Sequence, residues 1–521
     1  MIHGDDIFMG KPANEITNSL PARVSHKIKQ WIKKTPDALA LNEHSRSWTF
    51  AQLGQAIDAA RLHLEQHQVR PGDRVMIIGE NSCALIAFIM AASEMDAWIA
   101  IINARLSKHE IEGIKLDCEP RHIIYTAECS SEAKSHAQGQ NATFQQHPLL
   151  GEIAYSGTLE STPEPVSESG KDQVFAMIYT SGTTGQPKGV MLTHQNIAFV
   201  ATISGELRDL SQSDRVYTVL PISHVFGLAS TCLGTLFVGG CLYLAPRFDT
   251  SLCIKALLEQ RITVLQGVPP MFCALVDYLK NTKGMSANDL HLRYISCGGA
   301  PLDPETKKLT EEFFKIPLNN GYGMTETSPT ITQTRIDEPL ESCATGRPIP
   351  GVEIRLMAKD GTDVAKGEVG ELWIRGPNVM KGYFRKPEQT AEIINSDGWL
   401  NTKDLAQADE LDNVYIIGRT KEMIVKSGFN VYPAEVEAAL NTHPLVVQSA
   451  VIGRQVQGDE AVLAFVQPSA EGDLTVEMLK QHCRQLLSPY KCPSQITIMS
   501  ELPATATGKI LKSKLKNQAV A

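Results

Sequence analysis

The chain has 521 residues, of which 43% are hydrophobic, and a net charge of −9 without any block of lysine or arginine. One hydrophobic core stops growing beyond about 250–300 residues, so we expect two or more domains. The acidic balance argues against a nucleic-acid partner, which needs a basic face. Eleven cysteines without a CxxC pair indicate reduced thiols in a cytoplasmic protein, and Asp5 and Asp6 argue against a signal peptide.

Short apolar runs alternate with helix-like stretches, which predicts α/β domains with largely parallel sheets. The expected strands cover residues 75–78, 122–125, 174–179, 216–220, 241–244, 264–268 and 294–297. The uncharged interval 216–246 is long enough to cross a bilayer, but Pro221, His224 and two glycines interrupt it. A buried strand–helix–strand is therefore preferred. The Ser/Pro-rich segment 156–171 is expected to connect two α/β lobes.

The pattern changes after about residue 335. Strands expected at 352–357, 371–375 and 414–417 are joined by turns, which indicates a small β subdomain. Helices expected at 433–440 and 476–487 belong to a separate C-terminal domain. The sequence thus predicts an α/β fold: residues 1–420 form two α/β lobes and a β subdomain, and residues 421–521 form a small α+β domain.

The stretch YTSGTTGQPKGV, residues 179–190, follows one of these expected strands. Its glycines let backbone N–H groups converge on one anion, its hydroxyls add donors, and Lys188 adds a mobile positive charge. The alternative is a solvent-exposed turn, and the spacing differs from that of a P-loop. We interpret the stretch as a polyphosphate cradle formed by Thr180, Ser181, Gly182, Thr183, Thr184, Gly185 and Lys188.

The stretch GYGMTET, residues 321–327, places an aromatic ring between two glycines. Tyr322 can lie flat against a purine because Gly321 and Gly323 have no side chains to obstruct it. Thr325 can bind a phosphate, and Glu326 is a hard oxygen ligand suited to Mg²⁺. An ordinary turn at the end of a strand is the alternative. Upstream, the backbone of Gly298, Gly299, Ala300 and Pro301 could be approached by a ligand.

Three charged residues further along the chain complete the candidate site. Asp404 can accept hydrogen bonds from both hydroxyls of a ribose, and Arg419 can donate to the same sugar or to a phosphate. A surface salt bridge is the alternative for that pair. Lys509 follows a loop of small residues near the C-terminus, where an unremarkable solvated tail is the alternative.

Taken together, these segments resemble the adenylate-forming superfamily of acyl- and aryl-CoA synthetases, luciferases and adenylation domains of peptide synthetases. The motifs that agree in order and spacing are YTSGTTGQPKGV, GYGMTET, GELWIRGPNVMKGYF, GRTKEMIVKSGFNVYPAEVE and TGKI. The resemblance implies an ATP-dependent acid–CoA ligase that uses ATP, Mg²⁺ and coenzyme A. Acid and ATP first give an acyl-adenylate and pyrophosphate, and coenzyme A then displaces AMP.

The resemblance also implies roles for single residues. Tyr322 would stack on adenine, Glu326 would bind Mg²⁺, and Lys509 would bridge the carboxylate and the α-phosphate. Thr325 and His224 join Glu326 and Lys509 as candidate catalytic residues. Other implied positions are the phosphate-binding Thr180–Lys188, the ribose-binding Asp404 and Arg419, the further cofactor-binding Lys426 and Gly428, and the hinge Lys421. One departure is Lys403, where the family usually has a glycine that is expected to form a turn.

The acid pocket is expected to be lined by His224, Phe226, Gly227, Gly298 and Gly299. Small residues here and at Ala229, Ser230 and Cys232 leave room for a long or broad apolar acid. The segment has no acidic residue for a substrate ammonium and no arginine for a second carboxylate, which argues against an amino acid and against malonate. Aryl and fatty acids both stay open, with a slight preference for fatty acids.

Two other functions are alternatives to a CoA ligase. One is an acyl-AMP ligase that loads a carrier protein, although the insertion common in such relatives is missing from 416–428. The other is a non-catalytic nucleotide-binding relative, which would have no reason to keep Lys509. The expected partners are small molecules, with no nucleic acid and no transmembrane span. Peripheral membrane contact and the oligomeric state stay open.

Overall fold

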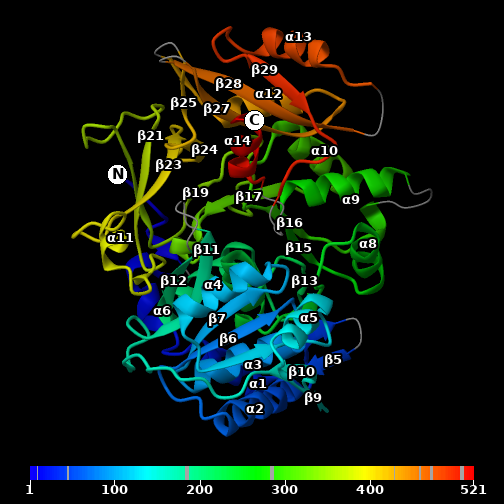
Figure 1. The fold of residues 1–521 in the computed structure, drawn as a ribbon, viewed down its shortest axis with the longest axis vertical. Coiled ribbons are helices and arrows are strands. Elements are labelled where there is room, and N and C mark those ends of the chain that lie inside the picture. The colour runs from blue at the N-terminus through cyan, green and yellow to red at the C-terminus, as the bar shows by residue number, and fades with distance from the viewer. Residues whose placement is uncertain are drawn as a thin grey trace.

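The computed structural model describes residues 1–8, 10–43, 46–181, 187–281, 287–426, 429–456, 459–469, 473–504 and 510–520. In the described part of the chain, two large mixed sheets form the main body, and a five-stranded antiparallel sheet adjoins them. A three-stranded sheet with its helices lies at one end of the molecule, at the top of Figure 1. The predicted α/β architecture with a small C-terminal α+β unit is confirmed.

The first lobe is built on an eight-stranded sheet in the order β22-β12-β11-β7-β6-β8-β10-β9. Its centre is parallel: β11 pairs with β7, β7 with β6, and β6 with β8. The strands of the centre are apolar and buried, as expected for strands covered on both faces. The bounds are β6 Arg74–Gly79, β7 Trp98–Asn103, β8 His122–Tyr125, β9 Thr143–His147, β10 Gly151–Tyr155, β11 Val174–Ser181, β12 Pro187–Thr193 and β22 Gly382–Tyr383.

The second lobe is built on a nine-stranded sheet in the order β19-β18-β17-β16-β15-β13-β14-β4-β5. The run from β17 to β4 is parallel. The bounds are β4 Leu39–Glu43, β5 Arg46–Thr49, β13 Arg215–Thr218, β14 Cys241–Leu244, β15 Val264–Gly267, β16 Tyr294–Cys297, β17 Leu318–Gly323, β18 Thr330–Gln333 and β19 Arg347–Pro348. Every strand expected from the apolar runs of both lobes is found, within a few residues at each end.

Most of the helices lie against the two large sheets, and the last three lie against the three-stranded sheet. Those of the first 240 residues are α1 Val24–Lys34, α2 Phe50–Gln66, α3 Cys83–Glu94, α4 Lys108–Cys118, α5 Ser131–Gly139, α6 His194–Leu207, a π-helix over Phe226–Leu233 and α7 Gly234–Phe237. The later ones are α8 Thr250–Glu259, α9 Pro269–Asn281, α10 Pro304–Phe314, α11 Pro387–Ala391, α12 Pro433–Asn441, α13 Val476–Leu486 and α14 Lys512–Val520. Short 3₁₀ turns lie at Ala13–Ser19, Ala287–Asp289 and Thr325–Thr327.

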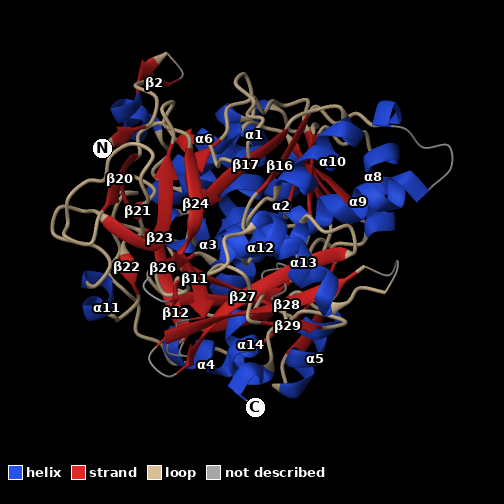
Figure 2. Cartoon of the chain, turned by 90° about the horizontal axis from the view of Figure 1, so that it is seen from above, coloured by secondary structure: helices blue, strands red, loops and turns tan. Residues whose placement is uncertain are grey.

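The antiparallel sheet after residue 335 has the order β1-β20-β21-β23-β24, so the extreme N-terminus supplies one edge of the predicted β subdomain. Its bounds are β1 Ile2–His3, β20 Glu353–Met357, β21 Gly370–Arg375, β23 Leu400–Ala408 and β24 Val414–Arg419, and a small hairpin pairs β2 Ile7–Phe8 with β3 Lys11–Pro12. In the C-terminal unit, β27 Val446–Val456, β28 Asp459–Pro468 and β29 Gln495–Ile498 form one sheet, and β25 Ile424–Lys426 pairs with β26 Phe429–Val431. Figure 2 shows β27, β28 and β29 side by side, with the β subdomain next to them.

The expectations for the uncharged interval 216–246 and for the Ser/Pro-rich segment 156–171 have different outcomes. The interval 216–246 is a strand, a π-helix, a short α-helix and a strand, as preferred. Among the described residues, none of the helices has the length and apolar character needed to cross a membrane. The expectation that 156–171 connects two lobes is wrong, because β10 before it and β11 after it belong to the same sheet. The segment runs along the surface of the first lobe, where the Glu164 amide donates to the Gly72 carbonyl.

Candidate active site

The described residues of the candidate phosphate cradle, Thr180, Ser181 and Lys188, lie on two paired strands. Strands β11 and β12 are antiparallel, and their register sets Thr180 opposite Lys188. The Lys188 ammonium lies 5.0 Å from the centre of the Tyr383 ring. The strand β22, which contains Tyr383, pairs with β12 at Val190. Gly182, Thr183, Thr184 and Gly185 lie outside the described residues.

Glu326 lies on the 3₁₀ turn Thr325–Thr327 and is buried, as is Thr325. The phenol of Tyr383 donates a 2.7 Å hydrogen bond to Glu326 Oε1, and the Met380 amide donates to the Glu326 backbone carbonyl. Burial, followed by the Glu326 charge, raises the pKa of Tyr383, so its hydroxyl keeps its proton at neutral pH. A carboxylate held in this way suits Mg²⁺, which prefers hard oxygen ligands.

Sequence reasoning assigned no role to Tyr383, although it lies within the family-like segment GELWIRGPNVMKGYF. Its ring contacts the Lys188 ammonium, and its hydroxyl contacts the Glu326 carboxylate. It therefore joins the cation of the phosphate cradle to the candidate metal ligand. The aromatic residue directly after Lys381-Gly382 was the available signal, but only the pairing of β22 with β12 shows where it points.

The structure brings Tyr322, Asp404 and Arg419 together. The Tyr322 hydroxyl donates to Asp404 Oδ2, and Arg419 Nε donates to Asp404 Oδ1 at 3.0 Å. Asp404 and Arg419 are paired across β23 and β24, with 5% of the Asp404 side chain exposed and 48% of the Arg419 side chain exposed. Burial opposes the charge of Arg419, but Asp404 raises its pKa overall. This pair offers the acceptor and donor groups that hydrogen bonds to a ribose require.

Three backbone positions near these residues have a positive φ or a close approach of another backbone segment. A Cβ on Gly323 would lie 1.9 Å from the Pro329 carbonyl oxygen, so no side chain fits there. On Gly321 it would lie 3.3 Å from the Thr332 carbonyl oxygen. Lys403 has a φ of 60°, in the left-handed region that favours glycine. The turn conformation expected at this position is thus found, with a lysine in it.

The residues expected to line the acid pocket lie at the start of the π-helix and just after the end of β16. The Phe226 amide donates to His224 Nδ1 at 3.3 Å, and the His224 carbonyl accepts from Leu228. The Phe226 ring packs against buried Gly298, where a Cβ would lie 3.3 Å from the nearest ring carbon. Gly299 is exposed with a φ of 76°, and an added Cβ there would meet only Val268, at 3.9 Å. Ala300 and Pro301 follow it at the surface.

The small residues expected to leave the pocket wall open have other reasons to be small. A Cβ on Gly227 would lie 2.2 Å from the Pro221 carbonyl oxygen, so a glycine at this position lets two backbone segments pack closely. Ala229, Ser230 and Cys232 are fully buried, and the Ser230 carbonyl accepts a 2.7 Å hydrogen bond from buried Arg208. The expected open wall is therefore not found at these positions.

The C-terminal candidates are less completely placed. Lys421 is exposed in the turn between β24 and β25, where the Glu422 and Met423 amides both donate to the Arg419 carbonyl. Lys426 ends β25 and is partly buried. Gly428 and Lys509 lie outside the described residues. Lys512, near the C-terminus, forms ion pairs with Glu422 at 3.0 Å and with Glu437 at 2.8 Å, which joins α14 to the start of the C-terminal unit.

Comparisons with known proteins agree with this geometry. The model of the AMP-binding enzyme family matches residues 28–384, and that of the AMP-binding enzyme C-terminal domain matches residues 435–509. A feruloyl-CoA synthase of Amycolatopsis sp. is 32% identical over 494 residues, covering 93% of this chain and 97% of the relative. A long-chain-fatty-acid–CoA ligase of Yersinia pestis is 35% identical over 450 residues, covering 81% of this chain and 77% of the relative.

Among solved structures, that of the O-succinylbenzoate coenzyme A synthetase of Bacillus subtilis in complex with ATP and a magnesium ion superimposes with a TM-score of 0.79. The two chains are 26% identical, and the match covers 94% of this chain and 99% of the other. The likeness thus extends over both the main body and the C-terminal unit.

Proposed function

The chain belongs to the AMP-binding enzyme family and is an AMP-forming acid–CoA ligase, and from this premise we propose that its substrate is a carboxylic acid with an aromatic ring. Members of this class use ATP, Mg²⁺ and coenzyme A. The acid is joined to AMP with release of pyrophosphate, and coenzyme A then displaces AMP to give the thioester.

The packing of Phe226 against Gly298 is the observation on which we base the choice of an aromatic acid. The ring lies 3.3 Å from where a Cβ on Gly298 would be, and we infer that it closes this side of the pocket to a long chain. A flat ring could still stack beside it, because Gly299 has no side chain and a Cβ there would meet Val268 at 3.9 Å. Offset or edge-to-face aromatic pairs add about 0.5–1.5 kcal/mol beyond the area that they bury. A compact aromatic acid therefore suits the pocket better than a long aliphatic one.

The nucleotide would lie along the contacts already described. Lys188 and the loop after β11 would hold the phosphates, Tyr322 the adenine, and Asp404 with Arg419 the ribose. Attack of a carboxylate on an anionic phosphate is opposed by charge repulsion, which fixed cations and aligned N–H donors reduce in a site that excludes water. Mg²⁺, held by Glu326, would supply further neutralisation of the phosphate charge. The acid needs no general base, since its carboxylate is ionised at pH 7.

A fatty acid is the second candidate, and the identity to the Yersinia pestis ligase favours it. A panel of acids separates the two. Pyrophosphate release should be measured with benzoate, phenylacetate, cinnamate, octanoate and palmitate, each with and without coenzyme A. We expect an aromatic acid to give the highest kcat/KM. If palmitate is preferred by tenfold or more, the proposal is wrong.

Phe226→Ala provides the matched test of the pocket. Removing the ring should raise kcat/KM for long acids relative to short aromatic ones by about tenfold, because ~1.4 kcal/mol corresponds to a factor of ten. Phe313→Ala, which truncates a partly buried phenylalanine of α10 elsewhere in the lobe, is the control and should leave the ratio unchanged. An unchanged ratio in Phe226→Ala would refute the role of the ring.

A substitution at Lys509 tests whether the protein catalyses adenylation or only binds a nucleotide. We propose that it contacts the reacting carboxylate and the α-phosphate, as its place in the family motif implies. Lys509→Ala should reduce pyrophosphate release by several orders of magnitude while thioester formation from added acyl-adenylate survives. Lys514→Ala, at an exposed lysine of α14, is the control. A carrier-protein acceptor would instead be indicated by pyrophosphate release without any thioester on addition of coenzyme A.

We also propose that the chain divides at residue 420 and that Lys421 is the hinge. The two apolar clusters of the C-terminal unit contain only residues within 424–515, so this unit has its own core.

We further propose that the protein acts in the cytoplasm. All eleven cysteines lie within the described residues and are free thiols, which suits a reducing compartment.

A further inference from the structure

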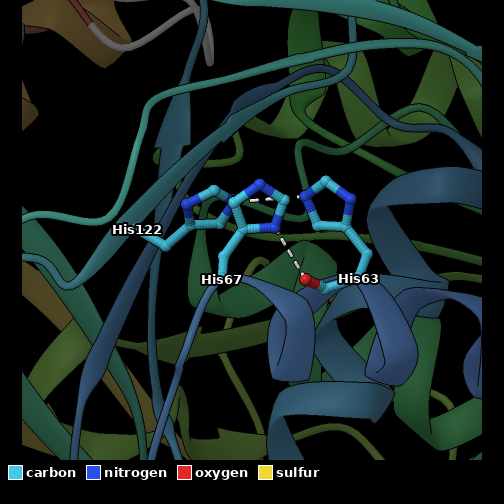
Figure 3. Close-up of side chains that lie close together, drawn as sticks. All are labelled: His63, His67 and His122. Carbon is cyan, nitrogen blue, oxygen red and sulfur yellow. Dashed lines mark hydrogen bonds between the residues drawn. The ribbon is translucent and has the colours of Figure 1, made fainter.

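Three histidines converge in the first lobe, far from the residues of the active site in sequence. His63 lies in the last turn of α2, His67 caps the same helix, and His122 begins β8. Their rings face one another in Figure 3. Tyr155, at the end of β10, packs against all three, with its ring 4.8 Å from His63 and 4.7 Å from His67 between centroids. None of these four residues belongs to the nucleotide or acid site.

The histidine cluster and the phosphate cradle lie at opposite ends of the parallel strands of the eight-stranded sheet. Strands β8 and β11 run parallel to the central strands β6 and β7. Thr180 and Ser181 of the cradle end β11, whereas His122 is the first residue of β8. The cluster is therefore separated from the cradle by the length of the strands, and it forms a distinct feature of the lobe.

The nitrogen atoms are spaced for one small metal ion. His63 and His67 are four residues apart, a spacing that places two imidazoles on one face of a helix. The Nε2 atoms of His63 and His122 are 3.1 Å apart. One ligand atom from each of the three histidines lies within 4.8 Å of the other two. Zinc–nitrogen bonds of about 2.0–2.1 Å in a tetrahedron place the ligand atoms roughly 3.3 Å apart, so only small ring movements are needed.

The surroundings hold the histidines in the state that a metal needs. His67 Nδ1 lies 2.8 Å from the His63 carbonyl oxygen, and donation there leaves Nε2 of His67 with a free lone pair. His63 and His122 are both buried. The carboxyl end of α2 also favours a cation through the helix dipole.

We propose that His63, His67 and His122 bind one divalent late transition-metal ion, with Zn²⁺ as the best match. Three imidazoles and one open position are a recurrent zinc arrangement, whereas Mg²⁺ prefers oxygen ligands. The proton between Nε2 of His63 and Nε2 of His122 moves to the Nδ1 atom of the same ring, so both Nε2 lone pairs face the ion and no proton is lost. The ion would tie the end of α2 to the start of β8.

Metal titration of the full chain tests this site. The protein, without a histidine tag and stripped with a chelator, is titrated with Zn²⁺ by calorimetry and with Co²⁺ by visible absorption, in excess Mg²⁺ and without ATP. We expect one equivalent of Zn²⁺ and the strong visible bands of four-coordinate Co²⁺. Zn²⁺ should raise the melting temperature, because an ion that binds only the folded state stabilises it. Absence of binding at 100 µM Zn²⁺ (a generous concentration for three imidazoles) would overturn the proposal.

Variants locate the ion. His67 is partly buried at the end of its helix, so His67→Ala should fold, and it should bind Zn²⁺ at least tenfold more weakly. His482→Ala alters a second close histidine pair, in which the His443 and His482 rings are 5.1 Å apart, and should bind Zn²⁺ like the wild type. If His67→Ala loses its cooperative melt, His67→Gln replaces it. Equal Zn²⁺ affinity in the folded His67 variant, or loss of the equivalent in His482→Ala, would refute the site.

Discussion

The phenol of Tyr383 donates a 2.7 Å hydrogen bond to Glu326 Oε1, which restrains the carboxylate that we expect to bind Mg²⁺. Hydrogen bonds to charged groups contribute about 1.5–3 kcal/mol. Tyr383→Phe should therefore raise the Mg²⁺ concentration for half-maximal pyrophosphate release by about tenfold. Tyr415→Phe, which removes a 3.1 Å contact with Ser342 at the surface, is the control. An unchanged Mg²⁺ dependence would show that the phenol does not position Glu326.

Lys403 has a left-handed backbone conformation, with a φ of 60°, which residues other than glycine rarely adopt. Its carbonyl accepts from Thr420, and its amide donates to Asn401 Oδ1 at 2.8 Å, so the surroundings fix this conformation. Lys403→Gly should relieve about 1 kcal/mol of strain, partly offset by the greater freedom of glycine in the unfolded chain. We expect a small rise in the melting temperature. Lys403→Ala keeps the Cβ and should give no rise, and an equal gain from both variants would refute the explanation.

Lys421 lies where the chain leaves the β subdomain for the C-terminal unit. Proline fixes φ near −65°, so Lys421→Pro should hold one orientation of that unit. One half-reaction should then fall far more than the other, whether adenylation, read as pyrophosphate release, or thioester formation, read from added acyl-adenylate. Lys421→Ala keeps the backbone free and should affect neither by more than a few-fold. Equal loss of both half-reactions in a Lys421→Pro protein that still melts cooperatively would contradict the hinge.

His194 makes the main body sensitive to acid. Its Nδ1 accepts a 3.2 Å hydrogen bond from the Val24 amide, and the ring is fully buried against Phe175. Burial, followed by the charges of Arg23 and His26, holds its pKa well below that of a free histidine. As the pH falls below about 6.5, the unfolded chain takes up a proton that the folded chain does not, so stability falls by up to ~1.4 kcal/mol per pH unit.

His194→Asn keeps an acceptor for the Val24 amide but cannot titrate. The variant should lose stability at every pH because it leaves a gap beside Phe175, while its melting temperature should fall less steeply between pH 7 and pH 5 than that of the wild type. His109→Asn, at an exposed position of α4, should keep the wild-type slope. A His194→Asn slope as steep as that of the wild type would mean that other groups dominate the acid response.

The sequence by itself determined the local elements. Apolar runs bounded by turn residues located β6, β8, β11 and β13–β16 within a few residues, because period, burial and turn chemistry act over a handful of neighbouring positions. The turn at Lys403 was expected from the resemblance, because the family usually has a glycine there, and the structure gives it a left-handed backbone. The ordered motifs also determined the family, since they specify residue types along the chain and not distances between them.

Only the tertiary structure decided which side chains meet. Segment 156–171 connects two strands of one sheet and not two lobes, and β1 joins a sheet whose other strands follow 350 residues later. Gly227 is small because of the Pro221 carbonyl, and Tyr383 reaches Glu326 through the pairing of β22 with β12. The spacing of His63 and His67 is visible in the sequence, but His122 reaches them from another strand. Such contacts depend on strand order and register. These are set by the long-range packing of the whole lobe, so local sequence patterns do not predict them.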